Sequence, residues 1–171
     1  MSVFLLGYRG SGKTTIGKRL ADRLWQPFVD TDEMIVKRAG MTIKEIFERQ
    51  GEDKFRDLET DVVKEVAGLD EHVIALGGGA VLREQNRDAL KSKPHKLIYL
   101  RCDAKVLRDR IHGDANTAAT RPNLTSLGGS IEEIEQLLAI REPIYRQCMT
   151  AELEVTNLTP EDAVVYIARL I

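Results

Sequence analysis

Residues 3–14 of this chain read VFLLGYRGSGKT, and this stretch decides the fold. The segment from Gly7 to Thr14 fits the pattern G-x-x-x-x-G-K-S/T and lies between an apolar strand-like run and an amphipathic helix-like run, which is the setting of a phosphate-binding loop. Glycines let the backbone curl so that N–H groups point at phosphate oxygens, and a helix N-terminus adds partial positive charge. The pattern arises by chance in roughly one of two hundred such chains. The stretch therefore predicts a nucleotide site.

The end of this loop carries chemistry suited to a nucleoside triphosphate. Lys13 is placed to reach the β- and γ-phosphates, and the Thr14 hydroxyl is a candidate ligand for Mg²⁺, which takes few protein ligands and keeps several waters. The chain lacks the Asp-x-x-Gly and Asn-Lys-x-Asp tetrapeptides of switch GTPases, and its 171 residues are too few for most motor or transport ATPases. Small kinases fit this size. The candidates for ATP binding in the loop are Gly10, Ser11, Gly12, Lys13, Thr14 and Thr15.

Strand-like and helix-like segments alternate along the chain, as in an α/β domain with a parallel sheet. The length of 171 residues, of which 43% are hydrophobic, predicts one domain. A helix is predicted over residues 13–24, and residue pairs typical of helix starts begin at Thr42, Ser130 and Thr159. Residues 112–129 predict a long loop, which we call the lid segment. The predicted strands are residues 3–6, 28–29, 73–76, 97–100 and 153–155.

The composition excludes several classes of protein. Lys and Arg number 25 against 27 Asp and Glu, without runs of like charge, so neither nucleic acid nor an anionic membrane is an expected partner. No apolar stretch approaches the roughly 20 residues of a membrane-spanning helix, and no secretory signal is visible, so we expect a cytoplasmic protein. Cys102 and Cys148 do not fit a disulfide framework or a zinc site. Because no long apolar face stands out, we expect a monomer.

Two acids, Asp30 and Asp32, follow the second predicted strand. Ligands of open α/β sheets bind at the carboxyl ends of the strands, and alternate residues of an extended segment project to the same side. We therefore expect both carboxylates at one site. One would hold a magnesium-bound water, and the other would accept a hydrogen bond from an acceptor hydroxyl. The alternative is that Asp32 only caps the following helix.

Two further candidate motifs lie in the middle of the chain, one in a helix-like stretch and one at the carboxyl end of the third predicted strand. Glu59 is three residues after Arg56 in a helix-like stretch and could orient its guanidinium, although a surface ion pair is the simpler reading of that spacing. Residues 77–79 are three glycines directly after the third predicted strand. Such a run suits close approach of the backbone to a ligand, and an unusual turn without a ligand is the alternative.

Two arginines in the second half of the chain are candidates as well. Arg121 precedes Pro122 in the lid segment and could swing over a transferring phosphate, or it could be a solvated loop residue. Arg141 lies two residues before Pro143, which should kink the helix that Ser130 begins. Spacing alone does not decide whether Arg141 faces the crevice or water.

Taken in order, these motifs resemble the shikimate kinases over nearly the whole chain. The match consists of the loop ending Gly-Lys-Thr-Thr, then Asp-Thr-Asp, Phe-Arg-x-x-Glu, Gly-Gly-Gly, Arg-Pro and Arg-x-Pro-x-Tyr. The resemblance implies a single-domain P-loop kinase, with a five-stranded parallel sheet flanked by helices on both faces and a lid loop. It also implies Mg-dependent transfer of the ATP γ-phosphate to the 3-hydroxyl of shikimate, in aromatic amino-acid and chorismate biosynthesis.

The same resemblance assigns roles to individual residues. Arg121 would be the lid arginine on ATP, Thr14 the magnesium ligand, and Asp30 a residue that holds the metal through water or acts as a base. Arg110 and the turn at residues 156–159, including Asn157, would lie near adenine. The acceptor region would span about residues 32–60, and catalysis would rest on Lys13, Asp30, Asp32 and Arg121. Shikimate would be bound by Asp32, Arg56, Gly78, Gly79 and Arg141.

The sequence departs from the family in the lid segment. Many members have two aliphatic residues after the lid Arg-Pro, whereas Asn123 takes the first of these places here, and Gly128 and Gly129 stand at the far end of a somewhat long lid. These departures concern lid motion and nucleotide affinity.

Two other functions remain open at this stage. A gluconate-type kinase would share the architecture but use another acceptor, and the arginine pair Arg56 and Arg141 is the feature that favours a carboxylated ring. A nucleotide-binding regulatory module without phosphoryl transfer is the second alternative. The presence of Asp30, Asp32 and Arg121 argues against it.

Overall fold

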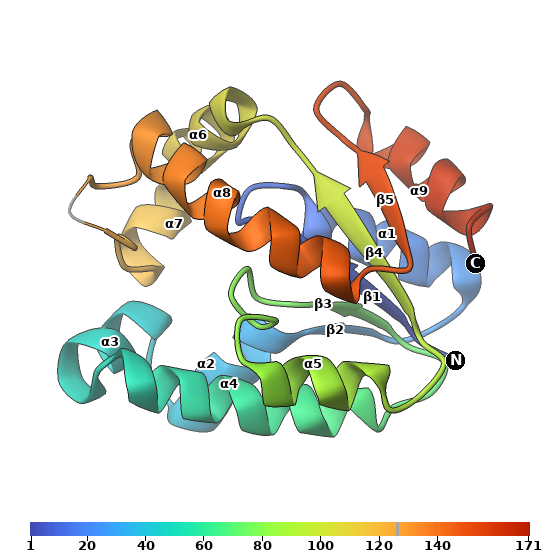
Figure 1. The fold of residues 1–171 in the computed structure, drawn as a ribbon, viewed down its shortest axis with the longest axis horizontal. Coiled ribbons are helices and arrows are strands. Elements are labelled where there is room, and N and C mark those ends of the chain that lie inside the picture. Colours follow the sequence, from blue (N-terminus) through green and yellow to red (C-terminus); the bar gives the residue numbers. More distant parts are fainter. Residues whose placement is uncertain (126) are drawn as a thin grey trace.

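A five-stranded, wholly parallel sheet in the order β2-β3-β1-β4-β5 forms the centre of the molecule (Figure 1). The computed structural model describes residues 1–125 and 127–171, and for residues 116–118 it describes the backbone only. All five predicted strands are confirmed, with ends within two residues of those expected. The strands are β1 Val3–Leu6, β2 Phe28–Asp30, β3 Val73–Ala75, β4 Lys96–Arg101 and β5 Ala151–Glu154.

Helices cover both faces of the sheet, as predicted. One face packs against α2, α3, α4, α5 and the C-terminal part of α8, and the other packs against α1, α6 and α9; in the view of Figure 1, α2 to α5 lie below the sheet and α8 crosses in front of it. The helices are α1 Lys13–Leu24, α2 Thr31–Ala39, α3 Ile43–Gln50, α4 Glu52–Ala67, α5 Glu84–Lys91, α6 Ala104–Gly113, α7 Ala115–Thr120, α8 Ile131–Cys148 and α9 Pro160–Ala168.

Each face of the sheet has its own apolar core, because successive side chains of a strand point to opposite faces. From β1, Phe4 and Leu6 pack with α2, α3, α4 and α5, whereas Val3 and Leu5 pack with α1, α6 and α9. All four residues of β1 are buried. A central strand that is apolar on both sides is the reason that the first strand could be recognised in the sequence.

The predicted helix starts are confirmed at Thr42, Ser130 and Thr159, each of which caps its helix with a side-chain oxygen. At Thr42 the reciprocal bond from Glu45 is also formed, so a full capping box begins α3. The helix α8 continues through Pro143 without interruption. The expectation that residues 112–129 form one long loop is wrong in part, because α6 extends to Gly113 and α7 occupies residues 115–120.

The register of the sheet brings the candidate residues to one edge. Asp30 pairs with Ala75, and Leu5 pairs with the same residue from the other side. The ends of β1, β2 and β3 are therefore level, so the loops that follow them lie side by side. In the described part of the chain, no helix is long and apolar enough to cross a membrane.

Candidate active site

The phosphate-binding loop encloses one end of a cavity of about 520 Å³. Gly10 and Gly12 adopt left-handed φ angles of 84° and 94°, which only glycine reaches without strain, and Gly12 precedes the first residue of α1. The Nζ atom of Lys13 donates hydrogen bonds to the carbonyl oxygens of Gly7, at 2.7 Å, and Tyr8, at 2.9 Å. Burial and the nearby Arg121 lower the pKa of Lys13 to about 8. The loop thus presents backbone N–H groups and one amine to an anion.

Asp30 joins the phosphate loop to the second strand. Its Oδ2 atom accepts a 2.7 Å hydrogen bond from the Thr14 hydroxyl. Its Oδ1 atom accepts from the backbone N–H of Asp32, at 2.9 Å, and Glu33, so Asp30 caps α2. The alternative in which Asp32 is the cap is wrong: Asp32 lies in the first turn of the helix.

Asp32 reaches the same cavity by a route that the sequence did not indicate. We expected an extended Asp30-Thr-Asp segment, but α2 begins at Thr31, and the helical turn carries Asp32 into the cavity that Asp30 also lines. Burial raises the pKa of Asp32, and the adjacent Arg121 opposes this rise. The Nη2 atom of Arg121 lies 2.9 Å from Asp32 Oδ2.

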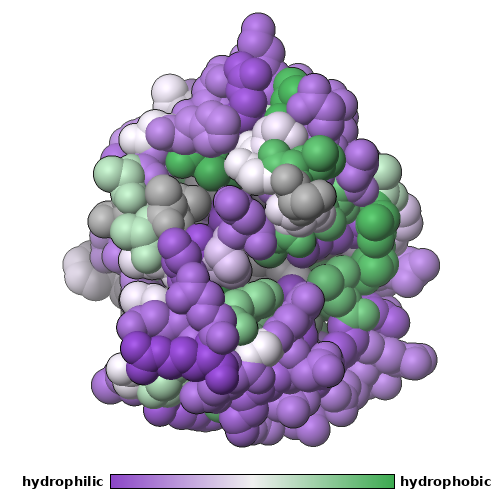
Figure 2. Space-filling view, turned by 90° about the vertical axis from the view of Figure 1, so that its left-hand side faces the viewer, coloured by the Kyte–Doolittle hydropathy of each residue, from purple (hydrophilic) through white to green (hydrophobic). Residues whose placement is uncertain are grey.

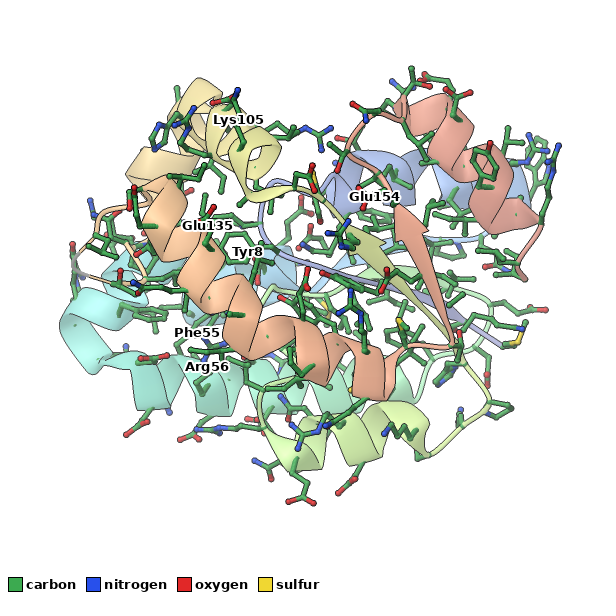
Figure 3. All side chains as sticks on the ribbon, turned by 45° about the horizontal axis from the view of Figure 1, so that its top comes forward. Tyr8, Phe55, Arg56, Lys105, Glu135 and Glu154 are labelled. Carbon is green, nitrogen blue, oxygen red and sulfur yellow. The ribbon has the colours of Figure 1, made fainter. Side chains whose placement is uncertain are left out.

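A second, smaller cavity of about 60 Å³ adjoins the first, and Asp32, Gly78 and Arg121 line both. Arg56 and Arg141 line this second cavity and are 8% and 6% exposed. In Figure 3, Phe55 and Arg56 rise from α4 toward α8, and Tyr8 lies on the phosphate loop beside α8. The guanidinium carbon of Arg141 is 5.5 Å from the centre of the Tyr8 ring. Arg141 therefore faces the crevice, which spacing had left undecided.

Arg56 is held in place by a buried carboxylate. Its Nη1 atom donates to Glu59 Oε2 at 2.6 Å, and Glu59 is 1% exposed. The surface ion pair that the spacing suggested is therefore wrong. The Nη2 atom lies 3.5 Å from Oε1 of the exposed Glu52, a longer contact that a bound anion can replace. A guanidinium has five N–H donors in all, so one fixed by a carboxylate can still bind a second anion.

The three glycines leave room for these side chains. A Cβ atom at Gly79 would lie 2.7 Å from Arg56 Nη2, and one at Gly77 would lie 2.6 Å from Asp32 Oδ1. None of residues 77–79 has a positive φ. Close approach by the side chains of Asp32 and Arg56 thus accounts for Gly77 and Gly79, whereas a Cβ atom at Gly78 would meet nothing nearer than 3.5 Å.

The lid segment covers the second cavity. Pro122 and Leu124 line it together with Arg121. The guanidinium of Arg9, in the phosphate loop, donates to the carbonyl oxygen of Pro122, with 3.4 Å from each Nη atom. Figure 2 looks onto this end of the molecule, where hydrophilic residues predominate in the lower part. The volume of this cavity, about 60 Å³, has room for only a few water molecules.

Comparison with known proteins agrees with this arrangement. The family model "Shikimate kinase" matches residues 9–171. The chain belongs to the shikimate kinase family.

Individual members of this family match nearly the full chain. The shikimate kinase of Symbiobacterium thermophilum is 39% identical over 98% of this chain and 94% of its own length. The shikimate kinase of Rhodopirellula baltica is 40% identical over 91% and 82%. The structure of shikimate kinase from Acinetobacter baumannii in complex with shikimate has a TM-score of 0.91 and 33% identity, covering 99% of this chain and 91% of the other. The predicted family and fold are confirmed.

Of the residues expected near adenine, Arg110 lines the larger cavity and Asn157 does not. The Nη1 atom of Arg110 donates to the carbonyl oxygen of Gly10 at 3.2 Å, and Arg110 lines the larger cavity. Asn157 is exposed and is not among the lining residues, whereas its neighbours Val155, Leu158 and Pro160 are. An apolar wall from this turn is suited to a flat base.

Reasoning from sequence missed several residues of this shikimate kinase family site. Arg9 occupies a variable position of the loop pattern, so nothing marked it as a bridge to the lid segment. Phe47, in α3, and Phe55, in α4, line the smaller cavity, but an apolar residue on a helix is ordinarily a core residue. Thr31, whose hydroxyl accepts from the backbone N–H of Gly77 at 2.9 Å, sits unnoticed between two aspartates. No local signal distinguishes these residues from packing.

Proposed function

We propose that this protein transfers the γ-phosphoryl group of ATP to the 3-hydroxyl of shikimate. The observation that carries the proposal is the smaller cavity, where two buried arginines, Arg56 and Arg141, lie beside Asp32 and directly adjacent to the phosphate loop. Shikimate combines one carboxylate with several hydroxyls. Guanidinium groups bind carboxylates in a bidentate manner, and a carboxylate accepts hydrogen bonds from hydroxyls, so the charges match.

In this proposal the protein positions the acceptor for attack and forms no covalent intermediate with it. Arg56 and Arg141 hold the ring by its carboxylate, and the N–H groups of the Gly78 and Gly79 loop face the hydroxyls. Asp32 accepts a hydrogen bond from the attacking hydroxyl and takes its proton as the new bond forms. Such positioning next to the phosphoryl group converts a bimolecular encounter into one between neighbours.

Two anions would compete for Arg121, namely the carboxylate of Asp32 and the triphosphate of bound ATP. The Nη2 atom of Arg121 lies 2.9 Å from Asp32 Oδ2, and both side chains line the acceptor cavity. We propose that the more highly charged triphosphate draws Arg121 away, which frees Asp32 for the hydroxyl and opens space for the ring. Together with Lys13 and the loop N–H groups, Arg121 then neutralises charge that develops on the transferring group.

The residues around Thr14 suit magnesium. Thr14 and Asp30 place a hydroxyl and a carboxylate at the larger cavity, joined by a 2.7 Å hydrogen bond. Among the described residues, no group of three or more His, Cys, Asp or Glu side chains is gathered as for a metal bound by protein alone. Hard oxygen donors in small number are what Mg²⁺ uses when water and phosphates complete its shell. The ion would supply charge neutralisation for the phosphates, with Thr14 as direct ligand and Asp30 acting through water.

The test is a coupled ADP-release assay with shikimate, gluconate and no acceptor. We expect ADP release that depends on shikimate and Mg²⁺, with gluconate at the background rate. Asp32→Asn and Lys13→Met should each abolish turnover while circular dichroism stays that of the wild type. Turnover of gluconate in place of shikimate, or near-normal rates in either folded variant, would contradict the proposal.

Two further expectations belong to this proposal. A monomer predicts a single species of 19.2 kDa in light scattering coupled to gel filtration, and a dimer would overturn it. A cytoplasmic location, predicted from the sequence, would be tested by fractionation of the source cells.

A further inference from the structure

Glu133 is a buried carboxylate that the proposed mechanism does not use. It lies in the first turn of α8 and is 0% exposed. Arg9 is near enough to interact with it electrostatically, but within the described part of the chain no Lys, Arg or His lies within the 4.0 Å of an ion pair. A buried carboxylate without a cation in direct contact is costly, so its hydrogen bonds call for an explanation.

The sequence predicted a different task for this side chain. Ser130 and Glu133 have capping-box spacing, and the Ser130 hydroxyl does accept from the backbone N–H of Glu133, at 3.2 Å. The carboxylate, however, turns to the lid segment. Its Oε1 atom accepts from the Thr125 backbone N–H at 2.5 Å and from the Thr125 hydroxyl at 2.7 Å. Of the two hydrogen bonds of a capping box, only the one to the Ser130 hydroxyl is formed, and the Glu133 carboxylate binds Thr125 instead.

Thr125 is close enough along the chain to control the position of Arg121. Four residues span at most about 14 Å when fully extended, so an anchor at Thr125 restricts where the Arg121 backbone can go. Between them, the Pro122 carbonyl accepts from Arg9, and Leu124 lines the smaller cavity. The segment that carries Arg121 is thus held at Thr125 by α8 and at Pro122 by the phosphate loop.

Thr125 also organises the chain on its other side. Its hydroxyl accepts from the Leu127 N–H at 3.1 Å, and its carbonyl accepts from the Gly128 N–H at 3.4 Å. Gly128 and Gly129 have φ angles of 63° and 77°, so the chain turns sharply there into α8. The anchor and the turn together join the lid segment to a long helix that also carries Arg141.

We propose that Glu133 is a positioning residue, whose carboxylate anchors the lid segment through Thr125 and thereby holds Arg121 over the boundary of the two cavities. The inference rests on the proposed function for the role of Arg121 on ATP. Anchoring confines Arg121 near its target before ATP arrives, so less conformational entropy is lost when the phosphates are bound. Loosening the anchor lowers the fraction of molecules in the binding-competent arrangement, which weakens apparent affinity by the same factor.

The experiment uses variants that preserve shape at both ends of the contact. Glu133→Gln removes the charge, and Thr125→Val removes the hydroxyl, whereas Thr125→Ser retains it. Glu135→Gln makes the same chemical change at an exposed residue of α8 (Figure 3) and is the matched control. Affinity for Mg·ATP is measured by calorimetry without an acceptor, and protection of the Thr125 amide is measured by hydrogen exchange.

We expect Thr125→Val, which removes one hydrogen bond to a charged group, and Glu133→Gln, which keeps the acceptor oxygen but makes it neutral, each to weaken ATP binding by about tenfold. Thr125→Ser and Glu135→Gln should stay within about twofold of the wild type. Amide exchange of the lid segment should accelerate in the first two variants only. Because both changes act on one contact, the double variant should be weakened by less than the product of the single effects.

The outcomes separate the anchor from the proposed function. Wild-type ATP affinity and lid exchange in both Glu133→Gln and Thr125→Val would overturn the anchor, even with shikimate as the substrate. Equal loss of protection throughout the domain would show a merely structural role and would also overturn it. If the wild-type protein failed to phosphorylate shikimate while these variants still lost ATP affinity, the anchor would stand and the assigned acceptor would not.

Discussion

Substitution of Gly79 by alanine tests whether the glycine run exists to admit Arg56. A Cβ atom at this position would lie 2.7 Å from Arg56 Nη2 and 2.8 Å from its Cζ atom, both well inside van der Waals contact. Either the guanidinium or the loop must shift. Arg56 is buried and bonded to Glu59, and the loop is tied at the Gly78 carbonyl by a 2.6 Å hydrogen bond from Tyr145. Neither can move without loss of a hydrogen bond.

The expected loss of stability follows from the broken ion pair between Arg56 and Glu59. If Arg56 swings away, Glu59 remains buried without its partner, and breaking such a pair costs about 3 kcal/mol or more. For a chain of this size, that loss lowers the melting temperature by roughly 6 to 12 °C. Displacing one charged contact to the shikimate carboxylate should raise KM for shikimate by roughly 10- to 100-fold. KM for ATP should change little, because Gly79 lines only the smaller cavity.

The assay is steady-state ADP release with each substrate varied, together with thermal unfolding followed by circular dichroism. Gly113→Ala is the control, because a Cβ atom there meets nothing within 4 Å and its φ is not in the left-handed region. It should leave both constants unchanged. A Gly79→Ala protein with the melting temperature and shikimate KM of the wild type would refute the argument that Arg56 fills the space beside Gly79.

Two further predictions concern charge and helix capping. Because burial lowers the pKa of Lys13 to about 8, while bound phosphates favour its charged form, ATP affinity should fall by about tenfold between pH 7 and pH 9. Binding at pH 9 should take up close to one proton, seen by calorimetry in buffers of different ionisation enthalpy; an equal pH dependence in Lys13→Met would contradict this origin. Thr42→Ala removes the capping box of α3 and should destabilise the protein by about 1 kcal/mol, with kcat unchanged. Thr159→Ala is a matched capping variant on α9, and a large fall in kcat in Thr42→Ala alone would indicate that α3 does more than support the site.

Local chemistry was sufficient for the five strands, for the helix starts at Thr42, Ser130 and Thr159, and for the phosphate loop. The strand before Gly7 is buried on both faces, and the loop glycines take left-handed angles that few other residues reach. These constraints act between residues that are neighbours in the chain, so they leave a readable pattern. The same holds for the cap at Thr42, where both partners lie within one helical turn.

Local chemistry was misleading where a side chain had a second, distant partner. Asp32 and Glu133 both had the spacing of helix-capping residues, yet Asp30 caps α2, and Glu133 binds Thr125. Arg56 and Glu59 had the spacing of a surface pair, yet both are buried. In each case the local motif permits several arrangements of similar energy, and contacts from another segment select one of them.

The amino-acid sequence by itself determined the parallel α/β architecture, the phosphate loop and the set of charged residues from which an acceptor site is made. Only the tertiary structure decided that Arg56 and Arg141 share one cavity, that Arg121 pairs with Asp32, and that Arg9 contacts the lid segment. The physical reason is the distance along the chain over which each kind of interaction acts. Propensity and capping depend on residues within about one helical turn, whereas burial and ion pairing depend on which segments the sheet order β2-β3-β1-β4-β5 brings together.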